Sequence, residues 1–306
     1  LEAGARIDVD DGKKNPADFA LWKAQKPGEP AWNSPWGPGR PGWHIECSAM
    51  SMKYLGETFD IHCGGKDLLF PHHENEVAQS ECATGKPFAR YWMHNGFINI
   101  NNEKMSKSAG NFFTVRDILK EFAAEDVRMF MLSAQYRSPI NFSREMIAQA
   151  HASLSRLYTA RDKMAFLARS AEDKPLSSEE EAFLGRIQAD AARFDAAMDD
   201  DLNTADAIGA LFELVRDANV TLGEQSSRSA VEKTLSTLTE LSDVLGLLER
   251  PAPEETLPEA VQALVDQRAA ARKAKDWALS DRLRDQLKAE GYLVEDTAKG
   301  QKVSKI

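Results

Sequence analysis

The sequence predicts an α/β fold in its first third, followed by an all-α region that runs to the end of the chain. The α/β prediction rests on a strand–helix–strand pattern over residues 59–94, with Gly64-Gly65 directly after its first strand. This order is typical of a parallel βαβ unit, which binds ligands at the carboxyl ends of its strands. From residue 114 onward apolar residues recur at helical spacing, and proline-containing linkers separate the helices into groups.

The composition is that of an ordinary globular protein without a membrane partner. Of the 306 residues, 42% are hydrophobic and 28% are charged, and no apolar run approaches the roughly 20 residues that span a bilayer. Three cysteines are an odd number, which argues against a disulfide framework and predicts a reducing, cytoplasmic location. The chain opens on Leu1 with sequence typical of the middle of a domain, so we expect it to be the C-terminal part of a longer protein.

The net charge of −10 is unevenly distributed. Residues 171–250 hold 7 Lys and Arg against 18 Asp and Glu, a net charge of −11, whereas residues 1–170 carry +1 and residues 251–306 carry 0. The acidic segment is most simply a solvated helical surface. Because the flanks are free to carry local basic patches, the overall charge does not exclude an RNA partner.

The elements of the first third are short and closely spaced. Residues 1–41 are rich in Pro, Gly and Trp and predict an irregular surface loop fixed by aromatic anchors, with a short helix possible over 15–22. Pro71 is placed as a first helical residue and Gly85 as a helix end. The elements expected are a helix ending near residue 53, a buried strand over 59–63, a helix over 72–82, and strands over 91–94 and 97–100.

The remaining elements are predicted to be helical. Thr114 begins a capping box that has Asp117 in place of the usual Glu, and Ser143 caps a long helix through about residue 169. A short strand is expected over 292–296, and the last ten residues are expected to fray. Further helices are expected over about 178–198, 204–220, 228–248, 259–274 and 277–289.

Cys47, His72 and Glu76 form a candidate zinc site. His72 and Glu76 are four residues apart on the predicted helix and so share one face, while Cys47 lies on an upstream element. A thiolate, an imidazole and a carboxylate are all zinc ligands, and three protein ligands leave a position open. The spacing matches no standard zinc signature, and a purely structural role for Cys47 and His72 stays open. The rival ligands are His62, Cys63, His73 and Cys82.

A lysine loop follows the α/β pattern. Lys104, Ser106, Lys107 and Ser108, with Met105 between them, precede a glycine at residue 110. Lysine presents a compact, rotatable charge that suits contact with phosphate oxygens, although an isolated pair of lysines is more often a solvated loop.

Taken together, these motifs resemble the cysteinyl-tRNA synthetases, a family of class I aminoacyl-tRNA synthetases. The lysine loop is similar to the KMSKS signature of the class, and the runs over 41–48, 59–65 and 70–76 are similar to the family's catalytic domain. Runs over 199–204 and 271–277 extend the resemblance through the whole chain. The resemblance implies the C-terminal half of a Rossmann-like class I synthetase catalytic domain, followed by helical tRNA-binding domains.

The resemblance also implies a domain order and a set of partners. The domains would be the second half of the catalytic domain over 1–113, a helical connecting region that contacts the tRNA stem over 114–172, a DALR-like helical bundle over 173–250, and an anticodon-binding domain over 251–306. The partners would be cysteine, ATP with Mg²⁺, tRNA(Cys), and the missing N-terminal half of the same protein. That half would hold a fourth zinc ligand, a cysteine, and the HIGH-type signature for ATP.

Residue roles follow from the same resemblance. One Zn²⁺ would be held by Cys47, His72 and Glu76, and would select the cysteine thiol. Lys104 and Lys107 would stabilise phosphate charge as catalytic residues, and Ser106 and Ser108 would join them in binding ATP. The residues implied for the amino-acid pocket are Trp43, His62 and, more weakly, Asp67.

Two other functions stay open on the sequence. A cysteine ligase of the mycothiol pathway resembles the same catalytic domain but acts on an amino sugar, and the helical region after residue 170 counts against it. A non-catalytic tRNA-binding fragment is the other. Both the synthetase and the tRNA-binding fragment would bind tRNA. For these two functions we expect residues 251–306 to contact the anticodon region through the basic residues before Trp277, which are Arg268, Arg272, Lys273 and Lys275.

Overall fold

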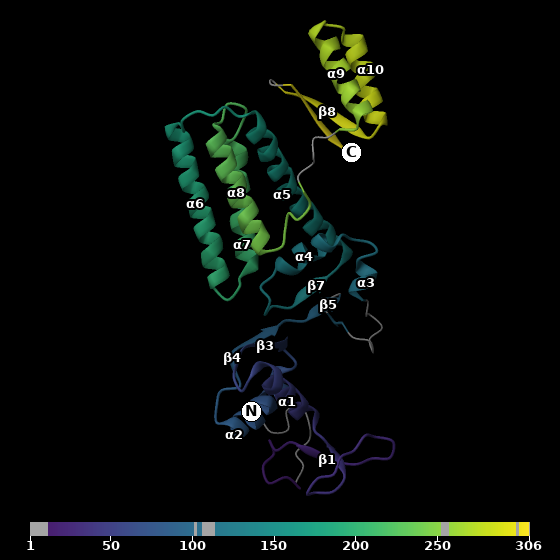
Figure 1. Cartoon of the computed structure of the whole chain (residues 1–306), viewed down its shortest axis with the longest axis vertical. Helices are drawn as coiled ribbons and strands as arrows, with labels where there is room; N and C mark the ends of the chain where they lie inside the picture. The colour runs from purple at the N-terminus through teal and green to yellow at the C-terminus, as the bar shows by residue number, and fades with distance from the viewer. Residues whose placement is uncertain (1–11, 101–102, 106–113, 252–256, 298–299, 306) are drawn as a thin grey trace. The chain divides into compact units, whose positions relative to one another are not determined.

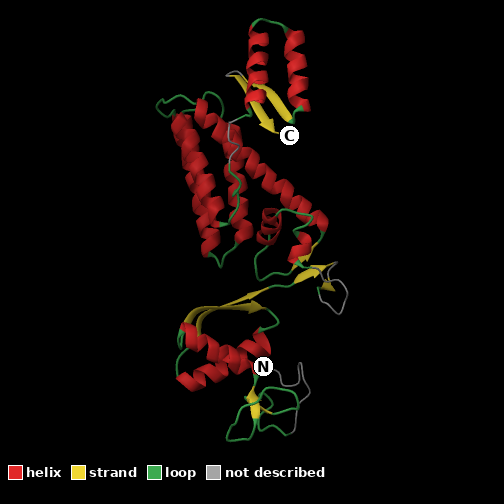
Figure 2. Ribbon diagram, turned by 45° about the vertical axis from the view of Figure 1, so that its right-hand side comes forward, coloured by secondary structure: helices red, strands yellow, loops and turns green. Residues whose placement is uncertain are grey.

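The computed structural model describes residues 12–100, 103–105, 114–251, 257–297 and 300–305. The chain divides into two compact units, one of residues 1–106 with 136–141 and one of residues 107–135 with 142–306 (Figure 1). The first unit is α/β and the second is mainly helical, which confirms the predicted fold class (Figure 2). Among the described residues, no helix combines the length and the apolar character needed to cross a membrane.

A parallel pair of strands forms the centre of the first unit. β3 (Phe59–Gly65) pairs with β4 (Ala89–Asn95), and α2 (Glu74–Thr84) makes the crossover between them. Figure 2 shows α1 (Trp43–Leu55) and α2 on the same side of these strands. The predicted parallel βαβ unit is therefore confirmed.

The expectation that the first of these strands is buried is wrong for this chain. Ile61 on β3 is 54% exposed, and Tyr91, its partner on β4, is 67% exposed. Parallel sheets are normally covered on both faces. These two side chains therefore mark a face of the sheet that the described residues leave open.

The helix predicted from residue 72 begins two residues later. A π-helical turn, η1 (Leu69–His73), precedes α2, and Phe70 within it has an extended backbone with φ −133° and ψ 131°. The residue before a proline disfavours the α conformation, so a regular helix cannot run through Phe70 into Pro71. The predicted end is correct, because Gly85 caps α2 in the left-handed region with φ 70°.

The N-terminal segment contains a small hairpin in place of the helix that seemed possible there. β1 (Trp22–Ala24) pairs antiparallel with β2 (Gly39–Pro41). Asn15 makes only a local turn, in which its side chain accepts a hydrogen bond from Ala17 N at 2.9 Å. That turn satisfies the groups that a helix would have used, so the prediction of a helix over 15–22 is wrong.

The strand predicted over 97–100 belongs to a second sheet, in which it pairs antiparallel with the strand that follows it. β5 (Ile98–Ile100) lies between β6 (Glu103–Lys104) and β7 (Ile140–Phe142). Ile140 N donates to Phe97 O at 2.9 Å. β7 corrects the prediction that the chain is helical from Thr114 onward, since a three-residue strand is too short to show a period in sequence.

Six helices follow in the second unit within the described part of residues 114–251. They are α3 (Val115–Ile118), α4 (Ala124–Leu132), α5 (Arg144–Ser170), α6 (Ser178–Asp199), α7 (Thr204–Thr221) and α8 (Arg228–Val244). Both predicted caps are confirmed: Thr114 and Asp117 form a capping box, and Ser143 Oγ accepts from Met146 N at 3.2 Å. The core between the long helices is apolar and includes Ile147, Leu157, Phe183, Leu211, Leu214 and Leu238.

Two details of this unit differ from prediction. α4 lies in the region predicted to be helical, although no bounds were predicted for it, and α8 ends at Val244 although a helix to residue 248 was predicted. Gly246 and Leu248 both have positive φ, 61° and 62°. The chain turns there because the buried Arg161 guanidinium binds the main-chain oxygens of Leu248 and Arg250, contacts that a continuing helix would not present.

The C-terminal segment forms its own small core. α9 (Glu259–Lys273) and α10 (Trp277–Ala289) pack with a hairpin of β8 (Tyr292–Thr297) and β9 (Gly300–Lys305) around Val261, Val265, Leu287 and Val294. β8 confirms the predicted terminal strand. The expected fraying of the last ten residues is wrong, because β9 pairs with β8 from Gly300 to Lys305.

Arg268 is a buried part of this segment and not a surface contact. It is 1% exposed, and its guanidinium makes two hydrogen bonds to Asp296, at 2.9 and 3.0 Å, and one to Gln301. The prediction that Arg268 contacts tRNA is therefore wrong. Its position on the inner face of α9 could not be read from the basic cluster alone.

We expect Asp296→Ala to destabilise this segment by about 2 kcal/mol, because the Arg268 charge would stay buried with one acceptor fewer. A fully buried pair would lose about 3–5 kcal/mol, but the Asp296 side chain is 37% exposed. Hydrogen bonds from Arg268 hold the pKa of Asp296 below its ordinary 3.8. The contribution of the Asp296 carboxylate to the free energy of unfolding is therefore present above pH 3.8. It is lost as the pH falls through the lowered pKa of Asp296.

Urea unfolding of the full chain, followed by hydrogen exchange of α9 and α10 amides, measures this effect. Asp285→Ala removes an exposed carboxylate from α10 and serves as the control. Equal protection of α9 in both variants at pH 7 would contradict the role given to Asp296.

Candidate functional site

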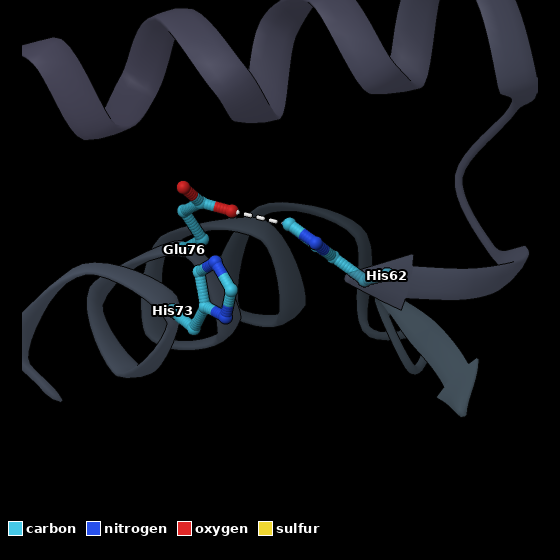
Figure 3. A group of neighbouring side chains, drawn as sticks. All are labelled: His62, His73 and Glu76. Carbon is cyan, nitrogen blue, oxygen red and sulfur yellow. Dashed lines mark hydrogen bonds and ion pairs between the residues drawn. The ribbon is translucent and has the colours of Figure 1, made fainter. Parts of the chain in front are cut away.

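A group of three metal-ligand side chains lies between β3 and α2 (Figure 3). It consists of His62 on β3, His73 at the end of η1 and Glu76 on α2, whose ligand atoms lie within 4.8 Å of one another. His62 Nε2 is 2.7 Å from Glu76 Oε2, and both His73 and Glu76 are 4% exposed. A buried carboxylate held by an imidazole is thus the centre of the site.

The two glycines of β3 make room for this group. A Cβ atom at Gly64 would lie 2.7 Å from His73 Cε1, and one at Gly65 would lie 2.6 Å from Asp67 Oδ1. The contact with the His73 ring leaves no room for a side chain at Gly64. The glycines were expected directly after the strand, whereas both lie within β3, where the missing side chains let neighbouring groups approach closely.

A second layer of rings supports the histidines. Trp92 on β4 stacks on His62 with ring centroids 4.5 Å apart and 19° between planes. His73 Nδ1 and His94 Nε2 are 2.9 Å apart. Burial, and then the neighbouring His62, lower the pKa of His73 to about 4 and also lower the pKa of His94. Both imidazoles are therefore neutral at pH 7, the form that binds metals.

Cys47 on α1 lies near the same carboxylate. Burial, and then the Glu76 charge, raise the pKa of the Cys47 thiol. Small polar side chains allow α1 and α2 to approach, since Ser80 Oγ donates to Ser48 Oγ at 2.7 Å. The thiol is therefore protonated beside the Glu76 carboxylate. A bound cation would instead favour the deprotonated thiolate.

His72 lies at the edge of the group, against α1. Its ring centroid is 4.4 Å from that of Trp43 and 5.0 Å from that of His44. Of the three predicted metal ligands, the structure brings Cys47 to Glu76 and leaves His72 packed on these rings. Among the described residues, the three ligand atoms that converge belong to Glu76, His62 and His73, two of which were rival ligands in the sequence.

The donor set suits zinc. His73 and Glu76 are buried and Cys47 is exposed nearby, and imidazole, carboxylate and thiol are ligand types that zinc takes in proteins. Cys63 and Cys82, the other two rival ligands, are exposed as well, and in the described residues no cysteine belongs to the converging group.

The residues implied for the amino-acid pocket lie on α1, on β3 and in the turn after β3. Trp43 is 58% exposed at the start of α1, and its Nε1 donates to His44 Nε2 at 3.0 Å. Asp67 is half-buried in the turn after β3, with its carboxylate beside Gly65. His62 lies between Trp92, on which it stacks, and Glu76, to which it hydrogen-bonds. The three therefore lie around β3 and α1, although Trp43 and His62 contact different rings.

The lysine loop is described only at its start. The Lys104 backbone belongs to β6 and pairs with Asn99, and Met105 N donates to Ile98 O at 3.2 Å. Ser106, Lys107 and Ser108 lie outside the described residues.

Trp92 and His94 were not selected from the sequence as site residues. Both lie on β4, and the register places Trp92 opposite His62 and His94 opposite Gly64. Residues 91–94 were predicted to be a strand, but the face that each side chain occupies is assigned only once the pairing with β3 is known.

Comparison with known proteins identifies this α/β unit and the helices after it. The model for the class I (C) tRNA synthetase catalytic domain matches residues 1–152, a DALR domain matches 193–249, and the cysteinyl-tRNA ligase anticodon-binding domain matches 254–303. The LeuRS of Agrobacterium radiobacter, solved in a ternary complex with tRNA and LeuAMS, covers 74% of this chain with a TM-score of 0.54 and 15% identity, over 36% of its own length. That likeness shows the fold alone.

Two curated relatives are more similar in sequence. The cysteine–tRNA ligase of Caldicellulosiruptor saccharolyticus is 55% identical over 307 residues, covering 100% of this chain and 65% of the relative. The cysteine–tRNA ligase of Symbiobacterium thermophilum is 55% identical over 302 residues, covering 98% of this chain and 64% of the relative. The chain thus spans about two-thirds of the length of these relatives.

The βαβ unit, the ligand-rich site beside it and the catalytic-domain match define a class I aminoacyl-tRNA synthetase. Within that class, the anticodon-domain match and the 55% identity to both relatives point to one amino acid, cysteine. The chain belongs to the cysteine–tRNA ligase family.

Proposed function

We propose that this chain is part of an enzyme that activates cysteine with ATP and transfers the cysteinyl group to tRNA(Cys). The observation that carries the proposal is that one chain matches both a class I catalytic domain and a cysteinyl-tRNA ligase anticodon-binding domain. Exchange of labelled pyrophosphate into ATP tests it in the protein completed with the N-terminal part of its relatives. Exchange with cysteine but not serine supports the proposal, and exchange independent of cysteine contradicts it.

The reaction requires positioning and charge stabilisation more than covalent catalysis. The cysteine carboxylate would attack the α-phosphorus of ATP, pyrophosphate would leave, and the cysteinyl group would pass to the 3′ end of the tRNA. Lys104 and Lys107 would stabilise phosphate charge, with Ser106 and Ser108 beside them and Mg²⁺ bound with ATP. Trp43, His62 and Asp67 would line the amino-acid side.

Zinc is the metal proposed for the site, held by Cys47, His72 and Glu76. Bound there, it would accept the substrate thiolate as a further ligand and so separate cysteine from serine, which a hydrophobic pocket does poorly. Glu76 is common to this set and to the converging group. His62 supports the proposal by donating to Glu76 at 2.7 Å, which fixes the orientation of the carboxylate.

Anticodon contact is proposed for the C-terminal segment, through the exposed face of α9 and α10. Trp277 is 56% exposed, and the Arg272 guanidinium lies 5.6 Å from the centroid of its ring. Arg272 also pairs with Asp296 at 3.0 Å, which holds it beside the indole. A fixed cation next to an exposed ring suits an unstacked base with its phosphate, and Lys273 and Lys275 follow in the same stretch.

We expect removal of residues 251–306 to weaken tRNA(Cys) binding by at least about tenfold and to flatten its dependence on salt, because cationic contacts release counterions from RNA. Fluorescence anisotropy between about 50 and 200 mM salt measures both quantities. Trp277→Ala should give part of the loss, with Asp285→Ala as the control on the same helix. Unchanged affinity and slope after the deletion would rule out the contact.

A cysteine ligase that acts on an amino sugar is the second candidate. The same catalytic chemistry would serve it, but the DALR and anticodon-binding matches over 193–249 and 254–303 favour a tRNA acceptor. A non-catalytic tRNA-binding fragment is favoured by no specific observation.

A further inference from the structure

A pocket outside the α/β unit lies between α5 and α7. It is a hollow open to solvent with a volume of about 420 Å³, within the range of roughly 300–1,000 Å³ that small-molecule sites occupy. α5 contributes Arg156, Thr159 and Ala160 to its lining, and α7 contributes Phe212 and Val220 among others. Lys163 Nζ on α5 donates to Asn219 Oδ1 on α7 at 3.3 Å, linking the two helices at the pocket.

The lining combines an apolar floor with two cations and no carboxylate. Val215 is buried below, whereas Val220 at the edge is 84% exposed. The Arg156 guanidinium lies 4.7 Å from the centroid of the Phe212 ring, and no carboxylate pairs with Arg156 among the residues that the structure describes. Arg216 lines the pocket too, although Glu213 and Asp217 partly neutralise it.

The charge of this pocket contrasts with its surroundings. Residues 171–250, which include α7, carry a net charge of −11, yet the pocket wall holds Arg156 and Arg216 without an acidic side chain. A cation that has no carboxylate partner within an acidic bundle favours an anionic ligand. The aromatic and aliphatic floor next to it favours a ligand that also has a flat apolar part.

We propose that the α5–α7 pocket binds one unstacked nucleotide of the tRNA, with the base on Phe212, Val220 and the Arg156 plane and the phosphate on Arg156 and Arg216. The inference rests on the proposed function, since it takes tRNA as the source of the nucleotide. Proteins read splayed-out bases of RNA by stacking them on aromatic rings and guanidinium planes, and a nearby cation neutralises the backbone. An acidic protein segment would neutralise the arginine charge but would offer no flat base to stack on the Phe212 ring.

Binding of tRNA(Cys) transcript to the full chain tests the proposal. Arg156→Ala and Val220→Asp are both surface changes, and each is expected to weaken binding about tenfold, as the loss of one stacked and neutralised base does. Arg193→Ala removes an exposed arginine from α6 and should leave affinity unchanged. Circular dichroism of each variant reports whether the bundle is intact.

Photo-crosslinking locates the nucleotide. Val220→p-benzoylphenylalanine is expected to crosslink to one or two adjacent nucleotides of the tRNA, whereas the same replacement at the exposed Val244 of α8 should not. Wild-type affinity in both pocket variants, or equal crosslinking from positions 220 and 244, would overturn the inference while leaving the proposed function standing. Absence of any tRNA binding by the unaltered chain would instead contradict the proposed partner itself.

Discussion

A polypeptide of residues 1–306 alone is expected to show negligible cysteine-dependent exchange of pyrophosphate into ATP. A nucleotide-binding α/β domain holds its ligand across the switch point, with loops from both halves of the sheet. Among the described residues the parallel sheet has two strands, β3 and β4, and one of its faces exposes Ile61 and Tyr91. The relatives are about half as long again as this chain, so the strands and ligands that complete the domain are expected in their additional length.

This prediction is tested by adding the part of a relative that the present chain does not cover. Adding the N-terminal part of the Caldicellulosiruptor saccharolyticus relative, in trans or fused in cis, should restore exchange by at least about 100-fold, since two sets of ATP contacts would again act together. The chain alone should still give helical circular dichroism and bind tRNA, because its C-terminal helices make mostly local contacts. Robust exchange by residues 1–306 would show that the two-stranded unit suffices.

Loss of zinc is the second large effect expected. In the completed protein, Cys47→Ala and His72→Ala should each lower the zinc content from about one per chain to well below half, because each change removes one of the protein ligands proposed for the metal. Plasma emission spectroscopy on dialysed protein measures it. Cys82→Ala removes an exposed thiol from α2 and should keep the metal.

The same measurement decides between the two overlapping ligand sets. His73→Ala should leave zinc bound if Cys47, His72 and Glu76 hold it, and should remove zinc if the converging group of His62, His73 and Glu76 does. Full retention of zinc in both Cys47→Ala and His72→Ala would contradict the proposed site.

The long elements of the fold were predictable because each repeats its pattern over many residues. α5, α6, α7, α9 and α10 begin and end within two residues of prediction, and the caps at Thr114 and Ser143 follow from local hydrogen bonds that the sequence names directly. Three-residue strands such as β1 and β7 carry no period, so their existence depends on partners far along the chain. The same holds for β9, which only pairing with β8 defines.

Site residues could be predicted from the sequence where their spacing along one helix was enough to place them together. They could not be predicted where the packing of different elements places them together. Glu76 was selected because it follows His72 by four residues, and it is the buried centre of the group. The contact of His73 with His94 depends on the register of β3 with β4, and the burial of Arg268 depends on Asp296. In the sequence alone, nothing distinguishes His73, His94 or Arg268 from the residues beside them.

Charging of tRNA is the measurement that tests the central claim most directly. The completed protein is incubated with labelled cysteine, ATP and either tRNA(Cys) or an amino-sugar acceptor, and the labelled product is isolated. Cysteine on the 3′ end of tRNA(Cys), with serine rejected and the amino sugar untouched, is the predicted result. Activation of cysteine followed by transfer to the amino sugar alone would contradict the proposed function and assign the chain to the other ligase.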